Sequence, residues 1–304
     1  MDILCANEVT KQFRNNKVLN RVSFGLSAGR IYALVGNNGS GKTTLFRTIM
    51  GLSFPTQGTV SLFGSNTARE TERARSRIGA LIENPILYYN TSGYQNLNYT
   101  RILKSIAKKD AIDDALQRFN LADKKHDSVR HYSLGMKQRL ALACALLGDP
   151  ELLLLDEPLN GLDPIGMREI ETTLLRANRD NGTTILISSH YLRQLYGFAS
   201  DYIFIDKGRI VGTTSNADLE KKCDKCIYLS ISEQERTIAL NVLSRVLSNE
   251  IRLLDHGEIC IYGFQENMDV IGNALSRERI TIEKLRTTGI NLEDYFIQMT
   301  GGNK

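Results

Sequence analysis

The sequence predicts an α/β fold in which a largely parallel sheet is followed by a smaller α+β domain. Short apolar runs recur through the first two thirds of the chain, and runs of this length are typical of strands buried on both faces. Stretches with helical spacing of apolar residues lie between them, as expected for a parallel sheet. At 304 residues and 42% hydrophobic content, the chain is long enough for two domains with separate cores.

Composition and charge exclude several function classes. The 38 Lys and Arg residues against 34 acids leave a net charge of +4, too small and too dispersed to indicate nucleic-acid binding. The longest aliphatic run, residues 152–155, is far shorter than the ~18–20 apolar residues that cross a bilayer. Asp2 stands near the start and no basic segment leads into an apolar one, so we expect no secretory signal and a cytosolic chain.

The five cysteines are an odd number, which favours reduced thiols over a disulfide framework. Only Cys223-x-x-Cys226 has a spacing that suits metal or redox chemistry. A zinc site needs two further ligands and the sequence has no second pair of this kind. Ordinary thiols are therefore the favoured interpretation, and a metal or redox role is the alternative.

The first 50 residues predict extended segments followed by a helix. Residues 18–26 alternate between apolar and polar, and residues 31–35 form a compact apolar run that ends at Gly36. This run predicts a central strand buried on both faces. Residues 43–50 have helical character directly after the glycines that follow it.

A helical insertion then interrupts the sheet pattern. Between residues 93 and 120 apolar residues recur every three to five positions, and we expect an inserted helical subdomain at about 84–148. The sheet pattern resumes afterwards, with strands separated by helices. The expected strands are 152–155, 184–188 and 202–205, and the expected helices are 164–179 and 191–198.

The composition becomes more charged near residues 218–224, where we place the domain boundary. The first domain is expected to span residues 1–220 and the second 221–304. The second domain has the pattern strand, helix, two strands, helix, strand, helix, which predicts a small α+β domain. Its strands are expected near 227–231, 251–254, 258–262 and 280–284.

A glycine-rich loop between the central strand and the following helix has the pattern of a phosphate-binding loop. Glycines allow backbone N–H groups to surround a phosphate, and the helix start adds a positive dipole end. Lys42 would reach the β- and γ-phosphates and Thr43 would bind Mg²⁺. A glycine-rich turn without a ligand is the alternative, which the flanking strand and helix disfavour. The predicted ATP-binding residues here are Gly36, Asn37, Asn38, Gly39, Ser40, Gly41, Lys42, Thr43 and Thr44.

Two carboxylates follow the apolar strand 152–155, and a histidine follows the strand 184–188. Ligands of open α/β sheets lie beyond the carboxyl ends of strands, so Asp156, Glu157 and His190 are expected to face the phosphate site. Asp156 fits Mg²⁺ binding, and Glu157 fits the base that polarises an attacking water. His190 fits a contact to the γ-phosphate. Alone, an acidic pair at a strand end is as often a solvated turn.

A Ser and a Gly precede the apolar helix 136–147. Ser133 stands 23 residues before Asp156, and such a turn can bind an anion at the helix start. By itself, an ordinary N-cap is the favoured interpretation.

These elements in this order resemble the ATP-binding subunit of ABC transporters, over about residues 2–220. The resemblance rests on the phosphate loop, the inserted helices, Ser133-Leu134-Gly135-Met136-Lys137-Gln138, residues 152–157, Leu159-Asn160-Gly161-Leu162-Asp163 and His190. It implies an ABC-type P-loop ATPase core with an inserted helical subdomain, followed here by the small C-terminal α+β domain. It also implies ATP hydrolysis, with ATP and Mg²⁺ bound.

The resemblance implies partners as well. In the family, two subunits enclose two ATP molecules, so it implies a homodimer in which Ser133, Leu134, Gly135, Met136 and Asp163 contact ATP bound by the other copy. It implies a separate membrane permease that holds the chain at the cytoplasmic face of the membrane. An aromatic residue upstream of the loop usually stacks on adenine, which assigns Phe13 and, nearby, Val18 to ATP binding. A Phe in a small β core is the alternative for Phe13.

The sequence departs from the family pattern at three positions. Leu134 replaces the usual Ser and Met136 a common Gly, and Glu83 stands where most members have a metal-contacting Gln. The Glu83 carboxylate can bind Mg²⁺ more tightly than an amide. Glu83, together with residues 80–85 and 292–296, resembles the subgroup that exports or protects against antimicrobial peptides, including bacitracin and lantibiotics.

Two other interpretations remain. A soluble ABC-class ATPase would act on ribosomes or DNA, but translation-type relatives usually carry two ATP sites and DNA-repair relatives insert long coiled coils. Here a single site is present, and only 91 residues separate Lys42 from Ser133. A non-enzymatic ATP switch is disfavoured because Glu157 and His190 are both present.

Overall fold

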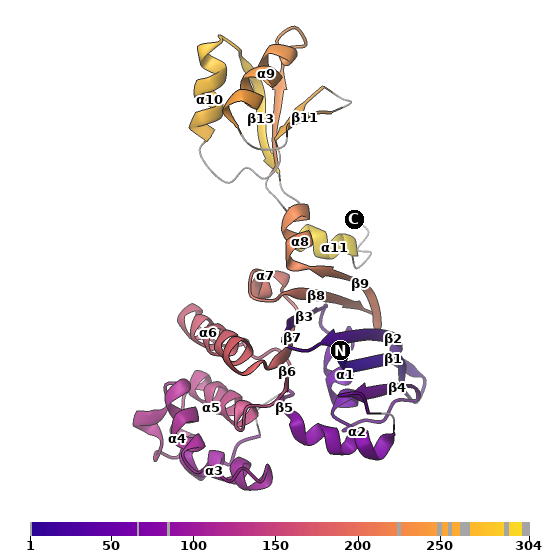
Figure 1. Ribbon diagram of the computed structural model, residues 1–304, viewed down its shortest axis with the longest axis vertical. Helices are drawn as coiled ribbons and strands as arrows, with labels where there is room; N and C mark the ends of the chain where they lie inside the picture. The colour runs from indigo at the N-terminus through magenta and orange to yellow at the C-terminus, as the bar shows by residue number, and fades with distance from the viewer. Residues whose placement is uncertain are drawn as a thin grey trace. The chain divides into compact units, whose positions relative to one another are not determined.

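The computed structural model shows two compact units, residues 1–215 and 216–304, each described by itself below (Figure 1). The predicted boundary lies five residues further along the chain than the one between these units. The structure describes residues 2–65, 67–83, 86–223, 226–247, 251–254, 257–261, 268–288 and 292–299.

The first unit contains two β-sheets (Figure 1). The smaller one is antiparallel, with the strand order β2-β1-β4. The larger one has the order β5-β6-β7-β3-β8-β9 and is parallel except for its last strand, β9. The strands are β1 (Asp2–Phe13), β2 (Asn16–Ser27), β3 (Ile31–Val35), β4 (Gln57–Leu62), β5 (Ile78–Leu81), β6 (Leu152–Leu155), β7 (Thr184–Ser189), β8 (Asp201–Asp206) and β9 (Arg209–Ser215).

The central strands confirm the predicted α/β fold. Every residue of β3, β6 and β7 is buried, as expected for parallel strands covered on both faces. Leu81 pairs with Leu155, Leu155 with Ile187, and Val35 with Ser189. The carboxyl ends of four adjacent strands, β5, β6, β7 and β3, therefore lie at one edge of the sheet, where ligands bind in open α/β sheets.

Helices surround the large sheet. The inserted helices α3, α4 and α5 gather in a lobe beside β5 and β6 (Figure 1). Ser92 caps α3 in a capping box with Gln95, and Ser133 caps α5. The helices of this unit are α1 (Lys42–Ile49), α2 (Ala68–Ala74), α3 (Gly93–Leu103), α4 (Ala111–Arg118), α5 (Leu134–Leu146), α6 (Pro164–Asn181) and α7 (Leu192–Leu195).

The helix expected at residues 191–198 is shorter than predicted. Only Leu192–Leu195 is helical, and Tyr196 already has extended backbone angles. Gly197, with a left-handed φ of 76°, follows this end. The buried Tyr202 of β8 adds contacts beside it. Its hydroxyl accepts from the Gly197 N–H at 3.3 Å and donates to the Leu195 carbonyl at 3.0 Å, which also accepts from the Ala199 N–H at 3.1 Å.

The second unit has the order β10, α9, β11, β12, α10, β13, as the sequence predicted, and begins and ends with α8 and α11 (Figure 1). Its antiparallel sheet has the order β11-β12-β10-β13, the ferredoxin-like arrangement. Its core is separate and includes Leu229, Leu243 and Ile261. The elements are α8 (Asn216–Cys223), β10 (Cys226–Ile231), α9 (Arg236–Val246), β11 (Ile251–Leu253), β12 (Ile259–Ile261), α10 (Met268–Arg277), β13 (Ile282–Thr288) and α11 (Leu292–Met299).

The strand expected at residues 280–284 lies later than predicted, at Ile282–Thr288. Ile280 belongs to the end of α10, because its N–H donates to the Leu275 carbonyl at 3.0 Å and Arg279 has a left-handed backbone, φ 57°. The side chains of Cys223 and Cys226 lie outside the described part of the structure, as do residues 262, 84 and 85 of the predicted segments.

Among the described helices, none combines the length and the apolar character that a membrane span requires.

Candidate phosphate-binding and hydrolysis site

The loop between β3 and α1 has the backbone shape of a phosphate cradle. Gly39 and Gly41 have φ values of 80° and 106°, a region that favours glycine. A Cβ on Gly36 would lie 2.4 Å from the backbone oxygen of Ile205, so no larger residue fits there. Asn37, Asn38 and Gly39 are exposed at the loop tip, and Thr43 and Thr44 are half-buried in the first turn of α1. This arrangement confirms the predicted strand, loop and helix.

Two buried polar groups of the loop fit an anionic ligand. Lys42 is 5% exposed, and its Nζ donates to the carbonyls of Gly36 at 2.7 Å and Asn37 at 3.2 Å. Among the described residues, the buried Ser40 Oγ has no hydrogen-bond partner. A buried hydroxyl without a partner costs free energy, which a phosphate oxygen accepting from it would recover.

A hydroxyl and a carboxylate lie together directly behind the loop. The Thr43 Oγ1 donates to Asp156 Oδ2 at 2.6 Å, and the Ser188 Oγ donates to Asp156 Oδ1 at 2.6 Å. Asp156 is 6% exposed. Hydroxyl and carboxylate oxygens are the ligands that Mg²⁺ prefers, and Mg²⁺ usually takes only one or two of them from the protein. The donor set therefore fits Mg²⁺ beside a bound phosphate chain.

Glu157 is the centre of the charged contacts. Its Oε1 lies 3.2 Å from Lys42 Nζ, its Oε2 lies 3.0 Å from His190 Nδ1, and the Asn160 side-chain amide also donates to Oε2. The Glu157 N–H donates to Ser188 Oγ at 2.9 Å, and its φ of 49° is left-handed. The structure therefore brings Lys42, Glu157 and His190 together, as the sequence predicted.

The Glu157 carboxylate is held in its charged form. Burial raises its pKa, but the Asn160 hydrogen bond and the positive charge of Lys42 outweigh burial, so the pKa lies below its ordinary value. An ionised carboxylate at neutral pH can accept a proton, as a general base must.

Sequence reasoning missed Ser188 and Asn160 as members of this site. Ser188 was seen only as the end of the strand before His190, and Asn160 only as part of the segment 159–163. Their positions carried a signal, because Ser188 is at the carboxyl end of β7 and Asn160 is one turn after Glu157.

The turn that begins at Ser133 contacts the segment 159–163 of the same chain. Ser133 Oγ accepts from the Met136 N–H at 3.2 Å and so caps α5. Leu134 is 66% exposed, and its Cδ2 lies 2.9 Å from the position of a Cβ on Gly161. Asp163 caps α6 through Gly166 N–H at 3.1 Å. No hydrogen bond or ion pair among the described residues joins these groups to the phosphate loop.

Glu83 forms an ion pair with an arginine of α1. Its Oε2 lies 2.7 Å from Arg47 Nη2, and each side chain is 48% exposed. Arg47 follows Thr43 by four residues, so both lie on one face of α1. Glu83 thus lies beside the helix that carries Thr43, with its charge paired to Arg47.

The two predicted adenine-binding residues have different surroundings. The Val18 backbone adjoins the phosphate loop, since a Cβ on Gly208 would lie 2.2 Å from the Val18 oxygen and Gly208 N–H donates to Ser40 O at 2.9 Å. Phe13 ends β1 and is 49% exposed, with Lys11 Nζ 4.8 Å from its ring centre. An exposed ring of this kind is free to stack on a base, and the alternative of a buried core Phe is wrong.

Comparison with known proteins identifies the family. Residues 19–160 match the family model described as ABC transporter. A bacitracin transport ATP-binding protein, BcrA of Enterococcus faecalis, is 36% identical over 304 residues, with 99% of this chain and 97% of that protein covered. The chain belongs to the ABC transporter ATP-binding family. This ATP-binding subunit is therefore an ATPase that uses ATP with Mg²⁺.

Two further relatives extend the comparison of this ABC subunit. A lantibiotic transport ATP-binding protein, SrtF of Streptococcus pyogenes, is 35% identical over 222 residues, covering 73% of this chain and 92% of that protein. A solved structure of an ATP-binding subunit of an ABC transporter superposes with a TM-score of 0.66 and 26% identity, covering 72% of this chain and 92% of that chain. Both matches place the shared part in the ABC ATPase core.

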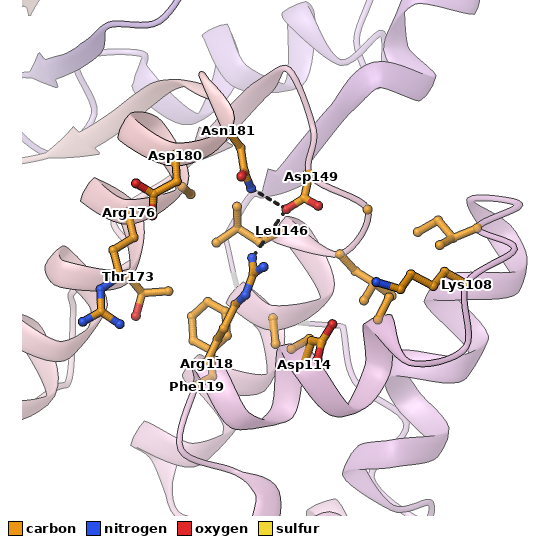
Figure 2. A pocket seen from close by; sticks show the side chains of 17 residues that line it. Lys108, Asp114, Arg118, Phe119, Leu146, Asp149, Thr173, Arg176, Asp180 and Asn181 are labelled. Carbon is orange, nitrogen blue, oxygen red and sulfur yellow. Dashed lines mark hydrogen bonds and ion pairs between the residues drawn. The ribbon is translucent and has the colours of Figure 1, made fainter.

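A separate cavity of the ABC subunit is not the nucleotide site. It has a volume of about 420 Å³ and lies between α4, the end of α5 and α6, lined by Lys108, Arg118, Asp149 and Arg176 among others (Figure 2). None of the predicted site residues lines it. A concave pocket is the usual first candidate for a ligand site, but here the phosphate chemistry is on the open edge of the sheet.

Proposed function

We propose that this chain is the ATP-hydrolysing subunit of a transporter that exports, or protects against, antimicrobial peptides of the bacitracin or lantibiotic type. The observation that carries the hydrolysis chemistry is the Glu157 carboxylate held between Lys42 and His190 behind the phosphate loop. The substrate class is supported by the full-length match to a bacitracin transport protein and by the match to a lantibiotic transport protein.

In the proposed site the loop residues 36–44 surround the phosphates, and Lys42 turns from Glu157 to the β- and γ-phosphates of ATP. Thr43 and Asp156 would hold Mg²⁺, which would supply positive charge beside the phosphates. Phe13 stacks on the adenine, with Val18 beside the loop.

Glu157 then acts on the attacking water. It accepts a proton from the water as the oxygen bonds to the γ-phosphorus, and the bond from that phosphorus to the β,γ-bridging oxygen breaks. His190, 3.0 Å from Glu157 Oε2, holds the carboxylate and contacts the γ-phosphate. Removing a general base of this kind lowers turnover by about 10²–10⁴-fold.

The proposed assembly is a homodimer in which the second copy completes each ATP site. Ser133, Leu134, Gly135 and Met136 of one copy face the γ-phosphate bound by the other. The 66% exposure of Leu134 leaves this turn accessible. Asp163 is the N-cap of α6, and we propose that it links the two ATP sites of the dimer.

The permease is proposed to dock beside Glu83 and residues 88–94, at the cytoplasmic face of the membrane. Exposed apolar and aromatic side chains support this surface, since Ile86 is 96% exposed, Tyr88 58% and Tyr89 48%. Nucleic acid is not among the proposed partners. The soluble alternative is disfavoured because the relatives named above are transport proteins.

Copurification tests the transporter function. The tagged chain is isolated with ATP from detergent-solubilised native cells, and its partners are identified by mass spectrometry. A stoichiometric polytopic permease is expected, and cells lacking the chain should become more sensitive to bacitracin or a lantibiotic. Ribosomal or DNA-bound partners without a permease would contradict the proposal and support the soluble alternative.

A further inference from the structure

We propose that Asn160 is a positioning residue for hydrolysis, whose side-chain amide holds the Glu157 carboxylate in the orientation needed to accept a proton from water. The proposal rests on the proposed role of Glu157 as the base. It assigns a function to a residue of the segment 159–163 within its own chain, in addition to the link that Asp163 is proposed to make between subunits.

Asn160 differs from the other partners of the Glu157 carboxylate. In the proposed site, Lys42 and His190 both contact phosphate oxygens once ATP is bound, so neither contacts Glu157 alone. The Asn160 Nδ2 donates to Glu157 Oε2, and Asn160 is assigned no phosphate contact in the proposed site. It is therefore the contact that can persist when the nucleotide arrives.

The contact between Asn160 and Glu157 lies within a single turn of the chain. Asn160 N–H donates to the Glu157 backbone oxygen at 3.3 Å, so the amide and the carboxylate belong to one turn. Glu157 has a left-handed backbone, and its N–H is held by Ser188 Oγ at 2.9 Å. Because the backbone of Glu157 is held in this way, the torsions of its side chain are the main freedom left to the carboxylate. The hydrogen bond from the Asn160 amide restricts these torsions.

The same turn is anchored to α5. The Gln138 Nε2 donates to the Pro158 carbonyl at 2.8 Å, and Leu134 lies against Gly161. Asn160 therefore stands on a segment that two residues of α5 contact. Reactive groups held by packed neighbours keep the geometry that catalysis requires, and displacements of about 1 Å can cost about 100-fold in rate.

Asn160→Ala and Asn160→Asp are the test variants, with kcat and KM for ATP measured separately. We expect Asn160→Ala to lower kcat by about 10–100-fold and to change KM for ATP little. Asn160→Asp keeps the size but places a second carboxylate at the base, so it should be at least as slow.

Asn181→Ala is the matched control. Asn181 Nδ2 donates to Asp149 Oδ1 at 2.7 Å, an asparagine-to-carboxylate hydrogen bond of the same kind, at the separate cavity (Figure 2). We expect its kcat and its KM for ATP to equal those of the wild type.

Glu157→Gln, measured in parallel, separates the possible failures. If Glu157→Gln is inactive while Asn160→Ala keeps the wild-type kcat and KM, the positioning role is wrong and the base assignment stands. A rise in KM alone for Asn160→Ala also overturns the positioning role. If Glu157→Gln turns over ATP at the wild-type rate, both the base assignment and the role of Asn160 are wrong.

Discussion

Glu83 is a charged side chain that we propose as a ligand of Mg²⁺. An amide at this position would be neutral, whereas the carboxylate makes an ion pair with Arg47. Both partners are about half exposed, and pairs of this kind contribute only about 0–1 kcal/mol. Because the pair is weak, we propose that Glu83 releases Arg47 and binds Mg²⁺ when the nucleotide binds.

Glu83→Gln tests this exchange. We expect ATP binding without Mg²⁺ to be unchanged, because the loop residues are untouched. We expect the gain in ATP affinity on adding Mg²⁺ to be several-fold smaller than in the wild type, because the charge that attracts the ion is lost. We also expect transport to be impaired. Fluorescent-ATP titrations with and without Mg²⁺, together with peptide export from cells, measure these effects.

Glu8→Gln is the control for Glu83→Gln, since Glu8 makes a similar exposed pair with Arg21 in the smaller sheet. Its Mg²⁺ dependence should match the wild type. Unchanged Mg²⁺ dependence and transport in Glu83→Gln would remove any special role for the carboxylate.

A lysine side chain donates to the carbonyls at the end of α5. Lys104, directly after α3, donates through Nζ to the carbonyls of Cys144, Ala145 and Leu147 at 3.0–3.3 Å. These carbonyls have no further partner within the helix because α5 ends there. A positive charge also interacts favourably with a helix C-terminus. Lys104 therefore ties α3 to the end of α5 in the inserted lobe.

Lys104→Met should destabilise the lobe by about 1–3 kcal/mol, because it leaves buried carbonyls without a donor. Thermal unfolding, followed by circular dichroism, measures the loss. Lys109→Met, at an exposed lysine nearby, should leave the melting temperature within error. Equal melting temperatures for Lys104→Met and the wild type would refute the capping role.

Burial lowers the pKa of Lys104 below its ordinary value of 10.5. The folded protein then releases this proton more readily than the unfolded chain does, so stability from Lys104 rises as the pH rises toward 10.5 and is lost as the pH falls through the folded pKa. The difference in melting temperature between wild type and Lys104→Met should therefore widen from neutral to alkaline pH. A constant difference would contradict this sign.

Elements with a strong local pattern could be predicted, and those fixed by distant contacts could not. The runs at residues 31–35 and 152–155 are apolar throughout, and both are buried strands. The strand β9 alternates between exposed and half-buried and was missed. The hydroxyl of Tyr202, in another strand, contacts the backbone at the end of α7, and no local pattern reveals this contact. Likewise, the glycine-rich loop pattern predicted Lys42 as a site residue. The hydrogen bond from the Asn160 amide to Glu157 could be seen only in the folded turn.

The described residues include two hydrophobic cores that lie in different units. One includes Leu34, Phe46 and Leu154, and the other includes Leu229, Leu243 and Ile261. Since no residue is shared between them, a loss of packing in one core should leave the other folded.

Leu243→Ala tests this division. Leu243 is fully buried in α9, so the substitution should cost about 2–5 kcal/mol. Hydrogen exchange measured by mass spectrometry should show lost protection in residues 226–288 and unchanged protection around the phosphate loop. Equal loss of protection in both units would show a single cooperative core.

ATP turnover by the Glu157→Gln variant tests the central claim most directly. The amide keeps the size of the side chain but cannot accept the proton, so kcat should fall by about 10²–10⁴-fold while ATP binding persists. With ATP and Mg²⁺ the variant should accumulate as a dimer on size exclusion. Hydrolysis at the wild-type rate would contradict the assignment of Glu157 as the base.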